Sequence, residues 1–263
     1  MKLADPRLEA GFVRVSVDGP RADVRLVRPE ARNAQTPATW RALAAVGELL
    51  APDVRVVVLS AEGASFSAGL DRRMLDGSGV PGEPALADLA RMPAAQLDAT
   101  IEEYQQGFTW WRESPAVTIA AVQGHAVGAG FQLALACDLM ICADDAQLAM
   151  RETSLGLVPD LGGTAPLLDA VGYGRALEIC ATGRWVRAAE AADLGIAQAV
   201  VPAAALASSV DDLVAALLAA PAGALVATKR LLGGARGRSR AEQRTAERAE
   251  QGQRLAELAR LLA

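Results

Sequence analysis

Two glycine-containing loops, each lying between a β-type run and a helical stretch, constrain the fold of this chain more than any other feature. The first reads GASFSAGLD over Gly63–Asp71, and the second reads QGHAVGAGFQLA over Gln123–Ala134. Such a loop can aim a backbone N–H at one oxygen, and a helix N-terminus favours negative charge there. A tight turn is enough to explain glycine in one loop alone. Both loops together predict paired N–H donors that hold an oxyanion, and hence activation of a carbonyl.

The hydrophobic pattern alternates between strands and helices over most of the chain. Thr36 followed by Pro37 is typical of a helix N-cap and first turn, and a longer helix is predicted over residues 85–112. The alternation favours an α/β fold with a mostly parallel sheet and helices packed outside it. The runs that predict strands are Val13–Val17, Ala22–Val27, Val54–Ser60, Val117–Val122 and Asp138–Ala143.

The last part of the chain changes character. From about Ser208 onward it consists mainly of Ala, Leu, Arg and Glu, and Ser239 with Glu242 forms an S-x-x-E capping box. We therefore predict a core over residues 1–205 that binds the ligand and carries out catalysis. A helical region over residues 206–263 is predicted to serve oligomerisation.

Composition and charge exclude several classes of protein. The 263 residues are 52% hydrophobic, enough for a sizeable core, and the net charge of −5 argues against nucleic-acid binding. No run of about 18 uncharged apolar residues occurs, and the N-terminal sequence MKLADPRLEA lacks the apolar core of a signal peptide. We expect a cytoplasmic protein that does not bind membranes, and any anionic ligand would need locally placed Arg or Lys.

Cysteine and histidine show no spacing that indicates a metal site or a nucleophile. Cys137, Cys142 and Cys180 lie in apolar surroundings without a C-x-x-C pattern, which indicates reduced core residues. His125, the single histidine, has no neighbouring Ser or Cys nucleophile signature and is interpreted as structural. The spacing G-x-x-x-G-x-G from Gly124 is similar to the cofactor loop of short-chain dehydrogenases, but no Tyr-x-x-x-Lys accompanies it.

Five sequence blocks follow one another along the chain: Arg28–Ala34, Ala64–Asp71, Gln123–Asp138, Ala146–Thr164 and Ala181–Val201. Together and in this order they resemble the crotonase superfamily, the enoyl-CoA hydratase/isomerase family, over nearly the whole length. The resemblance implies a spiral of ββα units with a helical C-terminal trimerisation region, assembled as a homotrimer or a homohexamer (dimer of trimers). It implies an acyl thioester of coenzyme A as substrate. By position in the motifs, the backbone N–H groups of Leu70 and Ala129 should be the oxyanion-hole donors.

The resemblance also indicates which side chains transfer protons. Hydratases of this family flank the thioester with two glutamates, whereas this chain has Gln132 at the first position and Glu152 at the second. An amide does not exchange a proton near neutral pH, but a buried carboxylate can. Double-bond isomerisation needs only one base, which moves a proton from C2 to C4, and related isomerases rely on one glutamate at the Glu152 position. We therefore prefer isomerisation, with hydration and a catalytically weak acyl-CoA-binding protein as alternatives.

Asp160 leaves a further alternative open. It matches the position of an aspartate in the dienoyl-CoA isomerases of this superfamily, in which a glutamate and an aspartate move protons between distant carbons. Those enzymes also have an aspartate where this chain has Gln132. Asp160 also fits an ordinary turn residue in the sequence PDLGG, since Pro, Asp and Gly all favour turns.

The same resemblance places the coenzyme A. It puts the adenine near Ala68 to Arg72, with Asp71 closing that loop, and it puts Arg32 and Lys229 near the phosphates, the lysine from a neighbouring subunit. Basic side chains attract phosphate, although each of these cations also fits a solvated surface charge. No metal or redox cofactor is expected, because the thioester already acidifies C2 and the loops stabilise the enolate.

Overall fold

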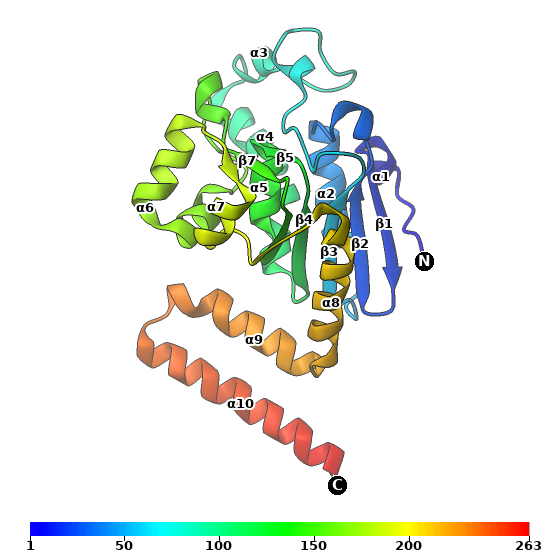
Figure 1. Ribbon diagram of the computed structural model, residues 1–263, viewed down its shortest axis with the longest axis vertical. Coiled ribbons are helices and arrows are strands. Elements are labelled where there is room, and N and C mark those ends of the chain that lie inside the picture. Colours follow the sequence, from blue (N-terminus) through cyan, green and yellow to red (C-terminus); the bar gives the residue numbers. More distant parts are fainter. Residues whose placement is uncertain (263) are drawn as a thin grey trace.

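The computed structural model describes residues 1–262, and its central element is a six-stranded sheet (Figure 1). The strand order is β1-β2-β3-β4-β6-β9, in which β1 and β2 form an antiparallel hairpin and the other neighbours pair in parallel. This confirms the predicted α/β class, and all five predicted strands occur. The strands of this sheet are β1 (Val13–Asp18), β2 (Arg21–Leu26), β3 (Val56–Ala61), β4 (Val117–Val122), β6 (Leu139–Ala143) and β9 (Ala199–Val201).

A second, smaller sheet was not predicted from the sequence. Its strands are β5 (His125–Val127), β7 (Gln147–Ala149) and β8 (Val186–Arg187), with β7 in the middle. Segments this short show no alternation by which a strand could be predicted. The small sheet is important for the site because β5 also bridges to Ser67, which joins the two glycine loops.

Helices cover both faces of the larger sheet (Figure 1). As predicted, Thr36 caps the second of them: its hydroxyl accepts from the Thr39 N–H, and Pro37 occupies the first turn. The helices are α1 (Pro6–Ala10), α2 (Pro37–Leu49), α3 (Leu86–Leu89), α4 (Ala94–Glu113), α5 (Ala129–Ala136), α6 (Thr164–Thr182), α7 (Ala188–Asp193), α8 (Leu206–Ala219), α9 (Ala222–Gly234) and α10 (Arg240–Leu262). Short 3-10 turns lie at Pro29–Ala31, Arg72–Met74, Glu152–Leu155, Ala203–Ala205 and Ala235–Gly237.

The predicted continuous helix over residues 85–112 is wrong. The chain instead forms the short α3 and a separate α4, which begins directly after Pro93. Proline has no N–H to donate and disfavours helical backbone at the residue before it, so it separates the two helices. The extended ψ of 143° at Pro93 confirms this break.

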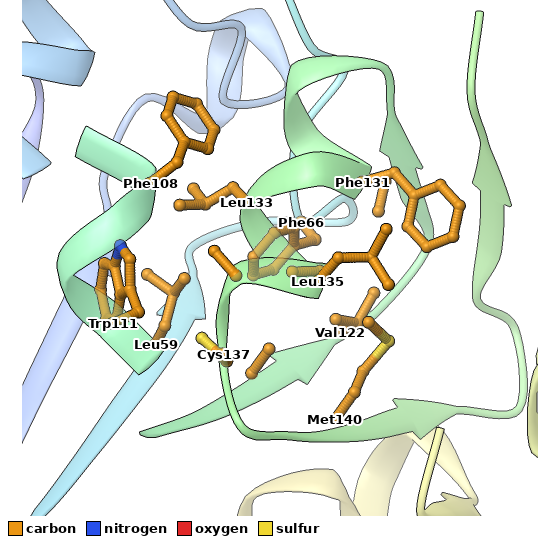
Figure 2. Packing of buried hydrophobic residues seen from close by; sticks show 14 of the residues in the cluster. Leu59, Phe66, Phe108, Trp111, Val122, Phe131, Leu133, Leu135, Cys137 and Met140 are labelled. Atoms are coloured by element: carbon orange, nitrogen blue, oxygen red, sulfur yellow. The ribbon is translucent and has the colours of Figure 1, made fainter. Parts of the chain in front are cut away.

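The main hydrophobic core anchors both glycine loops (Figure 2). Phe66 of the first loop is fully buried and belongs to the same cluster as Phe131 and Leu133 of α5. Every residue of α5 is buried, so the helix that follows the second loop has no face toward solvent. Both loops are thus fixed by close packing as well as by their turn geometry.

The helices after residue 205 differ in where they pack. Leu206, Val210 and Val214 of α8 cover the second face of the sheet, where they meet residues such as Ile119. Helices α9 and α10 form a hairpin that projects away from the sheet (Figure 1). The predicted division into a core over residues 1–205 and an oligomerisation region over residues 206–263 stays a prediction. Residue 263, the last residue of the second region, lies outside the described residues. Within residues 1–262, no single helix is long and apolar enough to cross a membrane.

We expect Phe66→Ala to lower the free energy of unfolding by about 3–5 kcal/mol, because it removes a fully buried ring and leaves a cavity. Urea unfolding followed by circular dichroism measures this loss. Phe12→Ala is the matched control: the Phe12 ring is 43% exposed, and its loss should cost less than about 1 kcal/mol. Equal losses in the two variants would contradict the packing described for Phe66.

Candidate active site

The two glycine loops lie against each other along their backbones. The Ser67 N–H donates to the His125 carbonyl oxygen at 2.9 Å, and the Val127 N–H donates to the Ser67 carbonyl oxygen at 3.0 Å. Gly69 has a φ of +81°, and a Cβ at this position would collide with the Val127 carbonyl oxygen. Glycine is therefore required at position 69 both for its backbone conformation and for this close approach.

Two backbone N–H groups lack an acceptor where the loops meet. Ala129 is the first residue of α5, where an N–H has no partner inside the helix, and Leu70 follows Gly69. Within residues 1–262, neither N–H donates to a protein oxygen. A Cβ at Gly69 would lie 3.5 Å from the Ala129 nitrogen, so the first loop reaches the start of α5. The α5 dipole adds positive potential at this point.

Ser67 fixes the first loop, a role that was not predicted from the sequence. Its Oγ donates to the Asn33 carbonyl oxygen at 2.8 Å and accepts from the Gln35 amide at 3.0 Å and from the Gly69 N–H at 3.2 Å. The residue is fully buried. Serine is common in glycine-containing turns, so nothing in the sequence distinguishes this one from an ordinary turn residue.

Glu152 places a carboxylate beside the two N–H groups. It begins the 3-10 turn after β7 and is 9% exposed. A Cβ at Gly128 would lie 3.3 Å from its Oε1, so the missing side chain at Gly128 leaves room for the carboxylate next to Ala129. Burial raises the pKa of Glu152, and hydrogen bonds oppose this only in part. Its Oε2 is buried and has no hydrogen-bond partner within the described part of the chain.

Gln132 contacts Glu152 and is hydrogen-bonded at both ends of its amide. Its Nε2 donates to Glu152 Oε1 at 2.6 Å, while its Oε1 accepts from the N–H groups of Leu161 and Gly163 at 2.9 and 3.2 Å. The structure thus brings the two predicted positions together, and only the carboxyl of this pair can exchange a proton near neutral pH. The segment around Gly163 has the sequence of an ordinary turn, so this backbone anchor was not predicted.

Asp160 lies near Glu152 without bonding to it. Although much of Asp160 is exposed, enough protein surrounds its carboxyl that the loss of hydration raises its pKa. Burial is the main cause of the raised pKa of Glu152, and the negative charge of Asp160 adds to it. The Gln105 amide of α4 donates to the Asp160 carbonyl oxygen at 2.6 Å and so ties this backbone to the core.

Asp71, at the end of the first loop, is the centre of a buried ion-pair cluster. Its Oδ2 lies 2.7 Å from Nη1 of Arg28 and 2.9 Å from Nη2 of Arg73. The hydrogen bonds from Arg73 and Arg28 hold the pKa of Asp71 well below its usual range, despite burial. Asp71 therefore stays ionised and fastens the first loop to the segment that begins at Arg28.

The predicted cations near the first loop occupy two kinds of place. Arg32 and Arg72 are exposed, and the Arg32 carbonyl oxygen accepts from the Ala68 N–H at 2.9 Å, so both flank the backbone around Ala68. Arg73, which was not among the predicted site residues, is partly covered and is engaged with Asp71. Arg32 and Arg72 thus present the cationic side chains that a phosphate could reach.

Lys229 does not join this group. Its Nζ donates to Asp138 Oδ2 at 2.7 Å and to the carbonyl oxygens of Ala116 and Trp111 at 2.6 and 3.2 Å. An ammonium has three N–H donors, and all three are engaged inside the subunit. This arrangement conflicts with the predicted contact between Lys229 and a phosphate of coenzyme A. The lysine instead fastens α9 to the ends of α4 and β6, and burial lowers its pKa.

Comparison with known proteins identifies the family. The profile of the enoyl-CoA hydratase/isomerase family matches residues 21–259, a span that contains both glycine loops, Gln132 and Glu152. The chain belongs to this family. The predicted resemblance to the crotonase superfamily is confirmed, as are the crotonase-like fold and the assignment to a family of enzymes.

Individual relatives of this family member include isomerases and hydratases. The mitochondrial Delta(3,5)-Delta(2,4)-dienoyl-CoA isomerase of Rattus norvegicus is 36% identical over 68% of this chain, and the chain spans only 55% of that relative's length. A Thermobifida fusca YX protein solved in complex with acetoacetyl-CoA is 49% identical, with a TM-score of 0.92 and coverage of 97% of this chain and 98% of that one. The enoyl-CoA hydratase of Polaromonas sp. JS666 is 30% identical, with a TM-score of 0.81 and coverage of 92% and 91%.

We expect Gly69→Ala to lower kcat on an acyl-CoA substrate by about 10²–10³-fold, because the new Cβ would push the loops apart and misplace an N–H donor. Steady-state kinetics with circular dichroism of the folded protein checks this. Gly77→Ala is a matched control: Gly77 has a similar φ of +80° but has open space around it. Similar kcat values for the two variants would argue against an oxyanion site at the junction of the loops.

Proposed function

We propose that this chain catalyses proton transfer on an unsaturated acyl-CoA through a thioester enolate, with double-bond isomerisation as its main reaction. The observation that carries the proposal is a single buried carboxylate, Glu152, next to two unpartnered N–H groups, with an amide where a second carboxylate would stand. The thioester carbonyl oxygen would lie between the N–H groups of Leu70 and Ala129. These donors would stabilise the negative charge that develops there.

Glu152 performs both proton transfers in this mechanism. Its carboxylate removes a proton from C2 of a 3-enoyl thioester, and the electrons of the C2–H bond pass to the carbonyl oxygen to form the enolate. The carboxylic acid then returns the proton to C4, and the double bond moves from C3–C4 to C2–C3. The raised pKa of Glu152 suits both steps, because the group must act first as base and then as acid near neutral pH.

Hydration is the alternative reaction, and Gln132 weighs against it. Adding water requires one group to activate the water and a second to deliver a proton to the other carbon. The Gln132 amide is already bonded at both ends and exchanges no proton.

A protein that binds acyl-CoA with little turnover is a further alternative. The unpartnered Oε2 of Glu152 speaks against it, because a buried, perturbed carboxyl is typical of a reactive site.

Asp160 supports a second candidate reaction, isomerisation of a 3,5-dienoyl-CoA. Moving two double bonds requires proton transfer between more distant carbons, and the carboxyls of Glu152 and Asp160 are close enough for their charges to interact. The rat relative named for that reaction is 36% identical to this chain. The dienoyl isomerases have an aspartate where this chain has Gln132, and this difference favours the simpler reaction.

We propose that coenzyme A binds along the first glycine loop. The adenine would contact the backbone from Ala68 to Arg72, and Arg32 and Arg72 would reach the phosphates. The T. fusca structures that hold acetoacetyl-CoA and CoA support this ligand class. No metal or redox cofactor is part of the proposal, because the thioester and the two N–H groups already make the C2 proton acidic enough to remove.

We also propose a homotrimer or a dimer of trimers in the cytoplasm. The α9–α10 hairpin carries large apolar side chains that are exposed in the single subunit, Leu232 at 71%, Leu255 at 56% and Leu258 at 55%. Apolar side chains that gather on one exposed element are typical of an association surface.

The test of the reaction is an assay of the purified protein with 3-enoyl-CoA, 2-enoyl-CoA and 3,5-dienoyl-CoA. We expect turnover of the 3-enoyl substrate, and Glu152→Gln should lower its kcat by about 10²–10⁴-fold because the general base is lost. Asp160→Asn should leave most of this activity. Efficient hydration of 2-enoyl-CoA would contradict the proposal. Turnover of 3,5-dienoyl-CoA that is abolished by both Glu152→Gln and Asp160→Asn would favour the second candidate, dienoyl-CoA isomerisation.

We expect the rate to decline on the acid side at a higher pH than an ordinary glutamate would give. Only the ionised Glu152 removes a proton, and burial raises its pKa, so activity is lost as the pH falls through this raised value. The acid limb of the kcat/KM profile, on which activity falls with pH, measures this decline. Asp160→Asn should move the acid limb to lower pH, because one negative charge that raises the pKa of Glu152 is removed. An acid limb that moves to higher pH would contradict this.

A further inference from the structure

The amide of Gln132 has only one favourable orientation in this site. Its carbonyl oxygen accepts from two backbone N–H groups, of Leu161 and Gly163, which can only donate. Rotating the amide by half a turn would place its NH₂ against these donors and leave a buried oxygen beside the Glu152 carboxylate. Because both changes leave buried polar groups unsatisfied, the NH₂ group must face Glu152.

This orientation makes the two oxygens of Glu152 different. Oε1 faces an N–H donor 2.6 Å away and cannot carry a proton toward it, because two donors would then oppose each other. Oε2 is buried and has no partner among residues 1–262, so it is the oxygen that remains available. We infer that Gln132 is a positioning residue that confines proton uptake and release to Oε2 of Glu152, an inference that rests on the proposed proton-transfer function.

The chemical consequence is that one oxygen serves both ends of the reaction. As the C2–H bond breaks, the Oε2–H bond forms and the electron pair moves to the thioester oxygen. When the enolate collapses, the Oε2–H bond breaks and the C4–H bond forms. With no protein partner on Oε2 to exchange its proton, a deuterium removed from C2 should appear largely at C4 of the same molecule.

Other ionisable groups near Glu152 must be considered in any pH measurement. Asp160, in the segment before α6, adds a negative charge, and Cys180 of α6 has a thiol whose pKa is raised by burial and by Glu152. Arg151 precedes Glu152, but its guanidinium donates to the Gly183 carbonyl oxygen at 2.8 Å. Gln132 is therefore the one side chain in the described structure that donates a hydrogen bond to this carboxyl.

The test compares two Gln→Met variants. Gln132→Met removes the hydrogen bond to Glu152 and the hydrogen bond to the segment around Gly163. Gln105→Met is the matched control, because it removes another hydrogen bond to the same segment, to the Asp160 carbonyl oxygen, and has no contact with Glu152. Two readouts are used: the acid limb of kcat/KM for 3-enoyl-CoA, and the fraction of C2 deuterium recovered at C4. We expect Gln132→Met to move the limb to higher pH and to lower label transfer at least about twofold, and Gln105→Met to leave both unchanged. Equal changes in both variants would overturn the positioning role.

A measurement without substrate separates this inference from the proposed reaction. In protein labelled with ¹³C at the glutamate carboxyls, the signal absent from Glu152→Gln identifies Glu152, and its titration should move to higher pH in Gln132→Met. Gln132→Leu is the second variant should the methionine disrupt folding, because leucine also has no donor and adds no charge beside Glu152; its Glu152 signal should also titrate at higher pH. A Glu152 titration unchanged in these variants would overturn the inference, even in an active isomerase. A shift in a protein without isomerase activity would support the positioning and refute only the reaction.

Discussion

The backbone contact between the two glycine loops is the constraint on which the site depends. Ser67 exchanges hydrogen bonds with β5, and the absence of a side chain at Gly69 allows the loops to touch. Leu70 lies in the first loop and Ala129 follows the second, so their N–H groups come together only because of this contact. Since Phe66 and the whole of α5 are buried, the core keeps the donors in place before any ligand arrives. Donors fixed in advance need no reorganisation when charge develops.

Two carboxylates close to this junction show how environment assigns roles to the same chemical group. Asp71 is paired with Arg28 and Arg73, which keep it ionised and make it a structural tie. Glu152 is also buried but receives a hydrogen bond from a neutral amide only, and its pKa moves the opposite way. The first arrangement suits a permanent charge and the second suits a group that gains and loses a proton.

The sequence was sufficient for those features that depend on local pattern. β-branched runs, the Thr36 cap and the order of the five blocks led to the main sheet, the loops and the family. Features that depend on partners distant in sequence were not accessible in this way. Nothing near Lys229 shows that Asp138 and two carbonyl oxygens surround its ammonium, and the two N–H groups that orient Gln132 belong to the backbone, which has no sequence signature. The short strands of the small sheet escaped prediction because pairing, and not pattern, defines them.

The complete burial of α5 has a consequence for how this scaffold can diversify. A helix that packs on every side tolerates few substitutions, so the corner at which α5 meets the two loops is resistant to change. The chain between Glu152 and Asp160 is different, because it is largely exposed and carries Leu155 and Val158 at its surface. Surface segments of this kind vary readily. Descendants of one ancestral protein can therefore diverge in this segment while inheriting unchanged the corner at which α5 meets the two loops.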